Sequence, residues 1–370
     1  MRKRLLALAP ILIAGNLMAQ SGAFQNTNDG KNSIFSHLDL GVTMGTTGLG
    51  IDLATPVGEK FRLRTGFAFM PHVGVPMNFG IQVGDDPSTS AEKFERLSAS
   101  LESMTGYKVD DKVQMIGRPC YYNFKLLVDF FPFHNKKWYV TTGFYLGSAT
   151  IGKAVNTIED MPSLLAVGIY NNMYEKVVNM EAFEIAGQSI GIEPGSPAYN
   201  AFLDYGRMGI QLGTYSHELP VRYQKNVYYD FDEYNDDNEI IHHAGDLMHR
   251  AGDIVYDDEG NPVMHQVGEA YRMEPGIDGM VRAKAKVNRF KPYLGFGYTN
   301  AIANSNGKYT FSFDCGLMFW GGTPDVYTHD GTNLTKDVDH IGGKVGRYVD
   351  FVKFFKAFPV VNVKIARRLY

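Results

Sequence analysis

Apolar and polar residues alternate almost without interruption in KYTFSFDCGLMFWGG, residues 308–322. This period of two predicts a β-strand with one apolar face and one polar face. The apolar face either packs into the core of a soluble sandwich or faces lipid, with a polar lumen on the other side of the strand. The rest of the sequence favours the second arrangement.

Eight further segments show the same alternation. They are residues 36–45, 48–56, 61–69, 121–131, 138–148, 280–288, 292–300 and 359–370. Their polar sides carry mainly glycine and small residues with a few charges of both signs, as expected for a narrow and filled lumen. We therefore predict an all-β fold, an antiparallel transmembrane β-barrel of about 8–10 strands with partly helical loop inserts.

The number of strands is left open by the alternation. Bacterial single-chain barrels have an even number of strands, whereas the alternating segments number nine. Ten strands result if residues 323–329, or part of residues 343–355, add a strand. Eight strands result if GTTG, residues 45–48, is not a turn and the first two segments form one long strand.

The amino terminus predicts export. Three cations at positions 2–4 precede an apolar stretch over residues 5–13, which is too short to span a bilayer as a helix. Small residues follow, so residues 1–19 are interpreted as a signal peptide that is cleaved before Gln20. No cysteine lies near the cleavage site, which argues against a lipid anchor. Beyond the signal peptide, no run approaches the roughly 18 consecutive apolar residues that indicate a membrane helix.

The connections between the alternating segments differ greatly in length. Long inserts occupy residues 71–119 and 153–279, whereas the turns at residues 56–60, 132–137 and 288–292 are short. Membrane barrels have short turns on the periplasmic side and longer loops outside. The asymmetry therefore supports a membrane barrel.

Both inserts have the spacing of amphipathic helices in places. The candidate helices cover residues 88–106, 161–183 and 196–213, and the first of them closes at Gly106. Because their apolar faces need burial, the inserts are expected to fold as a cap or to pack together. The mature chain, residues 20–370, is still expected to form a single outer-membrane β-barrel domain.

Aromatic residues gather around one of the predicted short turns. The segment DFFPFHNKKWY, residues 129–139, carries five of them. Aromatic side chains are enriched at membrane–water interfaces. The segment is therefore interpreted as part of an interfacial aromatic girdle.

Nine charged residues fall on the polar sides of the alternating segments. They are Asp52, Arg62, Arg64, Lys125, Asp129, Arg282, Lys284, Lys286 and Asp314. An unpaired charge in a narrow lumen is costly, so we expect these acids and bases to pair across the lumen and to block it. Replacing Asp129 or Asp314 by alanine is then expected to lower the melting temperature, and the wild-type barrel is expected not to conduct.

Two groups of possible metal ligands lie in the larger insert. The first is His242, His243, His249 and Asp246, and the second is Asp230, Asp232 and Asp236. Within the first group only the His242–Asp246 spacing suits ligands one helical turn apart. The second group lacks the glycine of a calcium-binding loop. Both are interpreted as polar loops, so no metal ligand and no cofactor is predicted.

Residues suited to covalent chemistry are few. Ser216, His217 and Glu218 are consecutive, whereas the members of a catalytic triad meet in space rather than in sequence. Chance adjacency is the favoured interpretation, and no catalytic residue is predicted. Nothing in the spacing of Cys120 and Cys315 brings them together, so a disulfide is not expected.

Several segments carry a family resemblance. They are GTTGLGIDLATPVGEKFRLRTGF, YNFKLLVDFFPF, KPYLGFGY, YTFSFDCGLMFWGGTPDV and a terminal strand that ends in an aromatic residue. In these segments the chain resembles the small outer-membrane β-barrel proteins of Gram-negative bacteria, particularly those of the Bacteroidota. The segments cover less than half of the chain. The resemblance implies a barrel located in the outer membrane.

Three functions from different classes are compatible with these features. The favoured one is a non-catalytic scaffold that sits in outer-membrane lipid and presents large loops to an extracellular protein or glycan, or serves envelope structure. The alternatives are a small diffusion channel and an outer-membrane hydrolase, or a secreted or periplasmic β-sandwich if the chain is not embedded in a membrane. Losing three leader cations lowers the formal net charge from −4 to about −7, and an acidic chain disfavours a nucleic-acid partner.

Overall fold

The structure is a computed structural model that describes residues 37–369. Short gaps within this range fall at residues 85, 186–187, 224–225, 230–231, 236–238, 251, 277, 304–306 and 355. The predicted signal peptide lies outside the described residues, and its cleavage stays a prediction.

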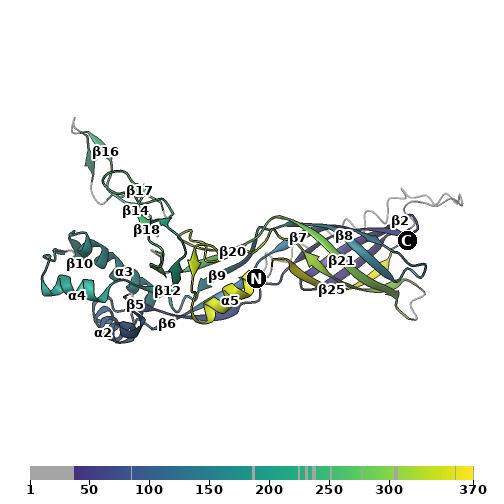
Figure 1. Ribbon diagram of the computed structural model, residues 1–370, viewed down its shortest axis with the longest axis horizontal. Helices are drawn as coiled ribbons and strands as arrows, with labels where there is room; N and C mark the ends of the chain where they lie inside the picture. Colours follow the sequence, from purple (N-terminus) through teal and green to yellow (C-terminus); the bar gives the residue numbers. More distant parts are fainter. Residues whose placement is uncertain are drawn as a thin grey trace, which may run out of the picture.

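Eight antiparallel strands close into a barrel at one end of an elongated molecule (Figure 1). In barrel order they are β1 (Asp39–Gly45), β2 (Gly48–Val57), β3 (Phe61–Phe69), β7 (Tyr122–Phe130), β8 (Trp138–Gly147), β21 (Phe290–Ala301), β22 (Tyr309–Met318) and β25 (Phe358–Arg368). The barrel closes between its first and last strands, where Val42 pairs with Ile365 on one side and with Ile51 on the other. The predicted fold class, an antiparallel barrel with partly helical inserts, is confirmed.

The barrel reaches eight strands in a way that neither predicted solution anticipated. GTTG is a turn, with Gly45 and Gly48 paired across it, so the first two segments are separate strands. The segment that does not belong to the barrel is residues 280–288, which contains β20 (Arg282–Lys286) of another sheet. Of the two proposed additional strands, β23 (Asp325–Thr328) also lies outside the barrel, and residues 343–355 contain the helix α5 (Gly343–Phe354).

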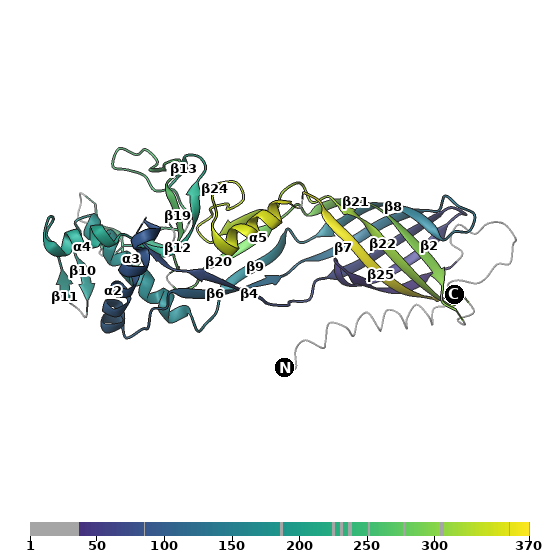
Figure 2. The same cartoon turned by 60° about the horizontal axis from the view of Figure 1, so that its bottom comes forward.

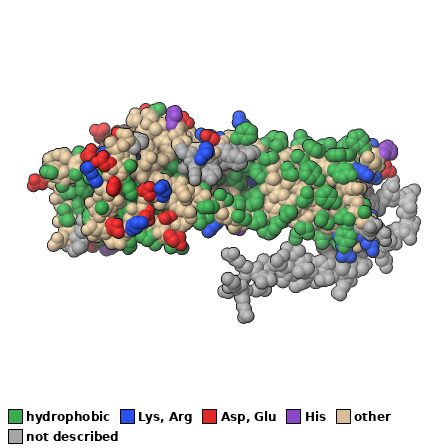
Figure 3. Space-filling model, turned by 90° about the horizontal axis from the view of Figure 1, so that it is seen from below, with side chains coloured by type: hydrophobic (Ala, Val, Ile, Leu, Met, Phe, Trp, Pro, Cys, Tyr) green, Lys and Arg blue, Asp and Glu red, His purple; other side chains and the backbone are tan. Residues whose placement is uncertain are grey.

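The barrel strands alternate between an apolar exterior and a polar interior. Val42, Phe311 and Ile365 point outward and are 63%, 41% and 55% exposed, whereas Thr43 and Ser312 point inward and are buried. Hydrophobic side chains are spread over the visible exterior of the barrel, while most acidic side chains lie on the opposite half of the molecule (Figure 3). Each strand therefore has the two-sided pattern from which the barrel was predicted.

Aromatic pairs line both rims of the barrel. At the rim where β1 begins and β25 ends the pairs are Phe61–Phe130 and Trp138–Tyr298, and at the other rim they are Phe67–Tyr122 and Phe144–Phe290. The predicted girdle segment contributes to the first rim through Phe130 and Trp138. Two of its aromatics differ from the prediction, because Phe131 and Tyr139 are buried and contact each other.

Connections at the two ends of the barrel are unequal. The strands β2 and β3, β7 and β8, and β21 and β22 are joined by short connections at the end where β1 begins and β25 ends. Long insertions join β3 to β7, β8 to β21, and β22 to β25 at the other end. Residues 288–292, predicted as a turn, are instead the passage from β20 into β21, and the insertion between β22 and β25 was not predicted.

Several barrel strands continue beyond the rim into a five-stranded sheet (Figures 1 and 2). In sheet order its strands are β23, β20, β9 (Thr150–Asn156), β6 (Lys112–Pro119) and β4 (Val75–Gly80). The sheet begins where the barrel ends, since β6 is followed by β7 after two residues and β9 follows β8 after two residues. We call this sheet the stalk sheet.

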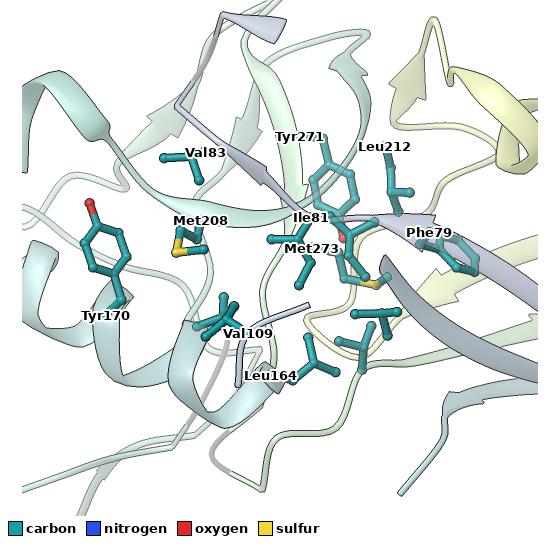
Figure 4. Close-up of a cluster of buried hydrophobic side chains, with 14 of the residues drawn as sticks. Phe79, Ile81, Val83, Val109, Leu164, Tyr170, Met208, Leu212, Tyr271 and Met273 are labelled. Carbon is teal, nitrogen blue, oxygen red and sulfur yellow. The ribbon is translucent and has the colours of Figure 1, made fainter. Parts of the chain in front are cut away.

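Beyond the stalk sheet the long insertions fold together into a head. The head contains a sheet of its own, in which β12 (Met208–Tyr215) lies between β19 (Ala270–Met273) and β24 (Val338–Asp339). The short strand β5 (Gln82–Val83) also pairs with β12. The head has its own hydrophobic core, in which Val83, Leu164 and Met208 are fully buried beside Tyr271 (Figure 4). The inserts are therefore a packed module rather than a set of separate loops.

Three helices cover this core. They are α2 (Pro87–Thr105), α3 (Met161–Val178) and α4 (Pro197–Tyr205). The helix α2 matches its predicted range: the Asp86 side chain accepts a hydrogen bond from the Ser88 amide, and Gly106 ends the helix in a left-handed conformation. The predicted helix over residues 196–213 is half wrong, because α4 stops before Gly206 and β12 begins two residues later.

A narrow arm of short hairpins projects from the head (Figure 1). Its strands are β13 (Leu219–Pro220), β14 (Val227–Tyr228), β15 (Glu233–Tyr234), β16 (Ile240–His242), β17 (Leu247–His249) and β18 (Met264–His265), and a further hairpin joins β10 (Phe183–Ile185) to β11 (Gln188–Ile190). Among the residues described, no helix has both the length and the apolar character needed to cross a membrane.

Candidate functional site

The largest cluster of charged side chains lies inside the barrel and centres on Arg64. One Arg64 Nη atom lies 2.7 Å from Asp129 Oδ1, and the other lies 2.9 Å from Asp314 Oδ2. Arg62 Nε donates a 2.7 Å hydrogen bond to the second oxygen of Asp129. Because β3 carries both arginines on its inward face, these two strand positions bridge acids on β7 and β22 across the lumen.

Neutral side chains complete this cluster. Tyr139 donates a hydrogen bond of 2.9 Å to Asp314, and Thr141 donates one of 2.7 Å to Asp129. The guanidinium of Arg62 also lies over the Tyr139 ring, 4.8 Å from its centroid. Each buried carboxylate therefore accepts from both cationic and neutral donors, which is how buried charges are accommodated in proteins.

A second ion pair lies between β2 and β7. Lys125 Nζ is 2.7 Å from Asp52 Oδ1, and both side chains are almost fully buried. The Thr43 hydroxyl donates a 2.8 Å hydrogen bond to the other Asp52 oxygen. The structure thus brings six of the nine charged residues assigned to the lumen into two paired groups.

The other three predicted lumen residues lie outside the barrel. Arg282, Lys284 and Lys286 belong to β20 of the stalk sheet, where Arg282 pairs with Asp278 and Lys286 lies over the Tyr327 ring. Their alternation with alanines has another cause: the stalk sheet packs one face against the head core, so β20 also needs one apolar and one polar side. The prediction for these three cations is corrected accordingly.

Two buried lysines in the barrel were missed by the sequence analysis. Lys291 donates hydrogen bonds to Asn123 Oδ1 and to the Ser148 carbonyl, both at 3.1 Å. Lys364 lies on the inward face of β25, opposite Ser312 of β22. Lys364 alternates with two outward β-branched residues and could have been found by that signal, whereas Lys291 was hidden inside a segment interpreted as a turn.

Aromatic and aliphatic side chains close the lumen at the end that faces the head. This buried cluster comprises Leu127, Tyr145, Tyr293, Met318, Trp320 and Val360. Deeper in the barrel, Gly297 makes room for the Tyr139 ring, since a Cβ atom there would lie 2.4 Å from Tyr139 Cζ. The interior of the barrel is therefore filled by side chains rather than open.

Ser216 and His217 form a contact without the geometry of a nucleophile and its base. Ser216 Oγ lies 2.9 Å from His217 Nδ1, but the hydroxyl also donates to the Lys336 carbonyl at 3.0 Å. With its proton directed to that carbonyl, the hydroxyl accepts from the imidazole and is not activated by it. The acid nearest the imidazole is Asp337, at 3.8 Å from Nε2.

The histidines proposed as possible metal ligands are spread along the arm. His242 stacks on Tyr229 and His249 stacks on Tyr223, while His243 lies 3.6 Å from Asp232. Asp230 and Asp236 lie outside the described residues. In the part of the chain that the structure describes, no three His, Cys, Asp or Glu side chains form a group suited to a metal ion.

Both cysteines are free. Cys120 lies between β6 and β7 at the barrel rim, and Cys315 lies in β22. Each is only partly buried.

Comparison with known proteins gives little further guidance. No protein-family model and no curated protein matches the chain. Similar solved structures include CarO2 and CarO of Acinetobacter baumannii, each 13% identical to this chain, with TM-scores of 0.32 and 0.33. Each match covers 91% of this chain, and the matches cover 100% of CarO2 and 99% of CarO. A major outer membrane protein from Thermus thermophilus is 9% identical over 90% of this chain and 98% of its own, with a TM-score of 0.25. TM-scores this low support no functional argument, so membership of the Bacteroidota-type barrels stays an expectation.

Proposed function

We propose that this protein is an outer-membrane β-barrel that anchors a folded head outside the membrane, and that the head is a non-catalytic scaffold for binding or for envelope structure. The observation that carries the proposal is the barrel exterior, which combines an apolar band with aromatic pairs at both rims. In water, an apolar surface of this extent is unfavourable, whereas lipid is its natural solvent.

Strand length supports the same proposal. A transmembrane β-strand needs about 9–11 residues when tilted by about 45°. The barrel strands β3, β7, β8 and β22 have 9, 9, 10 and 10 residues. The apolar band therefore has the height of a bilayer core, and a soluble β-sandwich offers no reason for an apolar outer face of that height.

The head supports the scaffold part of the proposal. Its insertions emerge at one end of the barrel and share one hydrophobic core, so they form one packed platform. Loops that are held by a rigid scaffold are where recognition is usually found. An extracellular protein or a glycan is the partner class that suits a platform outside the membrane.

The filled lumen weighs against the diffusion channel. Two buried ion-pair groups cross the barrel, and an aromatic cluster closes the end next to the head. We expect purified protein to give no steady conductance in planar bilayers. A reproducible unitary conductance would favour the channel instead.

Membrane residence and the role of the head need separate experiments. The mature protein should fractionate with the outer membrane and migrate faster on gels before heating than after it. For the head, residues 157–280 are replaced by a two-residue turn, which retains the pairing of Val155 with Arg282 at the top of the stalk sheet. We expect this variant to keep its heat-dependent migration on gels. Cells that display the variant should no longer bind to a glycan array or to immobilised extracellular proteins, whereas cells that display the intact protein should bind. Equal binding by both proteins contradicts the scaffold role.

A further inference from the structure

A row of three cations crosses the stalk sheet just beyond the barrel rim. Arg118 of β6 is paired in register with Lys153 of β9, and Lys153 is paired in register with Lys284 of β20. Residues directly opposite each other in neighbouring strands place their side chains on the same face of a sheet. All three side chains are exposed.

This row faces away from the head core. Ala154 of β9 and Val326 of β23 pack against that core, and they alternate with Lys153 and with Tyr327, the residue paired with Lys284. The three cations therefore lie on the opposite, open face of the stalk sheet. Of the residues that the structure describes, no carboxylate lies within ion-pair distance of any of the three.

An arrangement of this kind disfavours the folded state unless something neutralises it. Like charges directly opposite each other destabilise a sheet pair. Protection of an exposed sheet edge is a common reason for lysines in strands, but the edges of this sheet are β4 and β23, and the row lies on the three inner strands. The row is thus better suited to an anionic ligand than to stabilising the fold.

A groove connects the row to the aromatic rim. The groove has a volume of about 440 Å³ and is lined by Phe69 and Tyr122 of the rim, by His72, and by Lys153 of the row. Among its lining residues, all of them described, no Asp or Glu occurs. Both volume and lining suit a ligand that is apolar at one end and anionic at the other.

The height of the row indicates which anion it meets. Arg118 precedes the first residue of β7 by four positions, and Lys284 precedes the first residue of β21 by six. At about 3.3 Å per residue and a tilt of about 40°, the row lies roughly 10–15 Å above the rim. Glycerophospholipid headgroups extend only about 5–8 Å beyond the hydrocarbon core. A headgroup that carries phosphate on sugars reaches further out.

We propose that Arg118, Lys153 and Lys284 bind the phosphate groups of a phosphorylated glycolipid in the outer leaflet, with its apolar portion against Phe69 and Tyr122. This inference rests on the membrane location proposed above and extends it to a specific lipid contact. The arginine supplies a planar pair of donors, and the two lysines supply point charges, for the same phosphates. Such binding fixes the rotation and height of the stalk relative to the membrane surface.

The test uses the full-length mature protein in nonionic detergent and measures binding by native mass spectrometry. The probes are a bisphosphorylated glucosamine-disaccharide lipid, the same lipid without its phosphates, and inorganic phosphate. The variant R118Q/K153Q/K284Q is compared with R96Q/K108Q/K112Q, which removes the same charge from cations that pair with nearby acids on the head side of the molecule. A charge-conserving variant, R118K/K153R/K284R, separates loss of charge from loss of structure.

We expect the wild-type protein and the control variant to bind the bisphosphorylated lipid equally. Removing a single cation of the row should weaken binding about fivefold, and removing all three should weaken it on the order of a hundredfold, with a loss of salt sensitivity. The charge-conserving variant should retain most of the affinity, and the dephosphorylated lipid should bind weakly and equally to all variants.

Three results overturn the inference. They are equal affinity of the triple variant and the wild type, equal affinity for the lipid with and without phosphate, and binding of inorganic phosphate as tight as that of the lipid. Each of these outcomes leaves the membrane location intact. Failure of the proposed function looks different, because the wild-type protein would then lack heat-dependent migration and would be recovered without detergent.

Discussion

Asp129 is the acid on which two lumen arginines converge, so Asp129→Ala is the most informative single change in the barrel. Its two oxygens lie 2.7 Å from Arg62 Nε and 2.7 Å from Arg64. Breaking a buried ion pair by removing one partner typically costs about 3–5 kcal/mol. Arg64 keeps Asp314 as a partner and Arg62 is slightly exposed, so we expect a loss near the lower limit, about 3 kcal/mol of the free energy of unfolding.

The measurement is urea-induced unfolding of the protein in lipid vesicles, followed by the gel mobility of the folded barrel. The matched control is Asp110→Ala, which removes the partner of Lys108 in an exposed pair on the head and should leave the midpoint unchanged. The double variant Arg62→Ala/Asp129→Ala should lose less free energy of unfolding than the two single variants lose in total, by about 0.5–3 kcal/mol.

A free energy of unfolding for Asp129→Ala within about 0.5 kcal/mol of the wild type, the range of ordinary surface changes, would contradict a buried ion pair at Asp129. Simple addition of the effects of Arg62→Ala and Asp129→Ala, without coupling, would contradict it as well. Either result means that the two arginines do not meet Asp129 inside a dry lumen.

Three further outcomes follow from particular contacts. Gly297→Ala should destabilise the barrel by about 1–3 kcal/mol in the same unfolding measurement, because the added Cβ would clash with the Tyr139 ring. In the head, burial raises the pKa of the Glu274 carboxyl, although nearby Arg207 opposes the shift. The contribution of Glu274 to the stability of the folded head is therefore complete below its unfolded pKa of about 4.3 and is lost as the pH rises through the folded pKa. Glu274→Gln should accordingly stabilise the head at about pH 8 and change its stability little at about pH 4, as measured by hydrogen exchange. Ser196→Ala removes the side-chain acceptor for the Tyr199 amide and should lower hydrogen-exchange protection of α4 by about 1 kcal/mol.

The barrel was predictable because lipid imposes a rule on every strand that it touches. Alternation located all eight barrel strands, including the register that places Arg64 and Asp129 in the lumen. The same rule failed at β20, since a strand with a protein core behind it alternates in the same way as a strand with lipid behind it. Alternation indicates that one face of a strand is apolar, but it does not indicate whether lipid or protein covers that face.

Contacts between residues far apart in the chain were the second feature that could not be predicted from the sequence. The pairing of Arg118 with Lys153, and of Lys153 with Lys284, joins three strands from two insertions, and single-sequence periodicity carries no signal for it. The head core likewise depends on contacts between insertions that follow different barrel strands. Helix boundaries were clear only where a cap was visible, as at Gly106, whereas the change from α4 to β12 beyond Gly206 was not.

The two tryptophans provide the most direct test of a barrel embedded in lipid. Trp138 lies on the barrel exterior at 48% exposure, and Trp320 lies in the closed lumen mouth at 7% exposure. The variants Trp320→Phe and Trp138→Phe each leave one emitter, and both are folded into vesicles of phosphatidylcholine brominated on its acyl chains. Strong fluorescence quenching of Trp138 with little quenching of Trp320 is the predicted result. Equal quenching of the two, or no quenching of Trp138, would contradict the account.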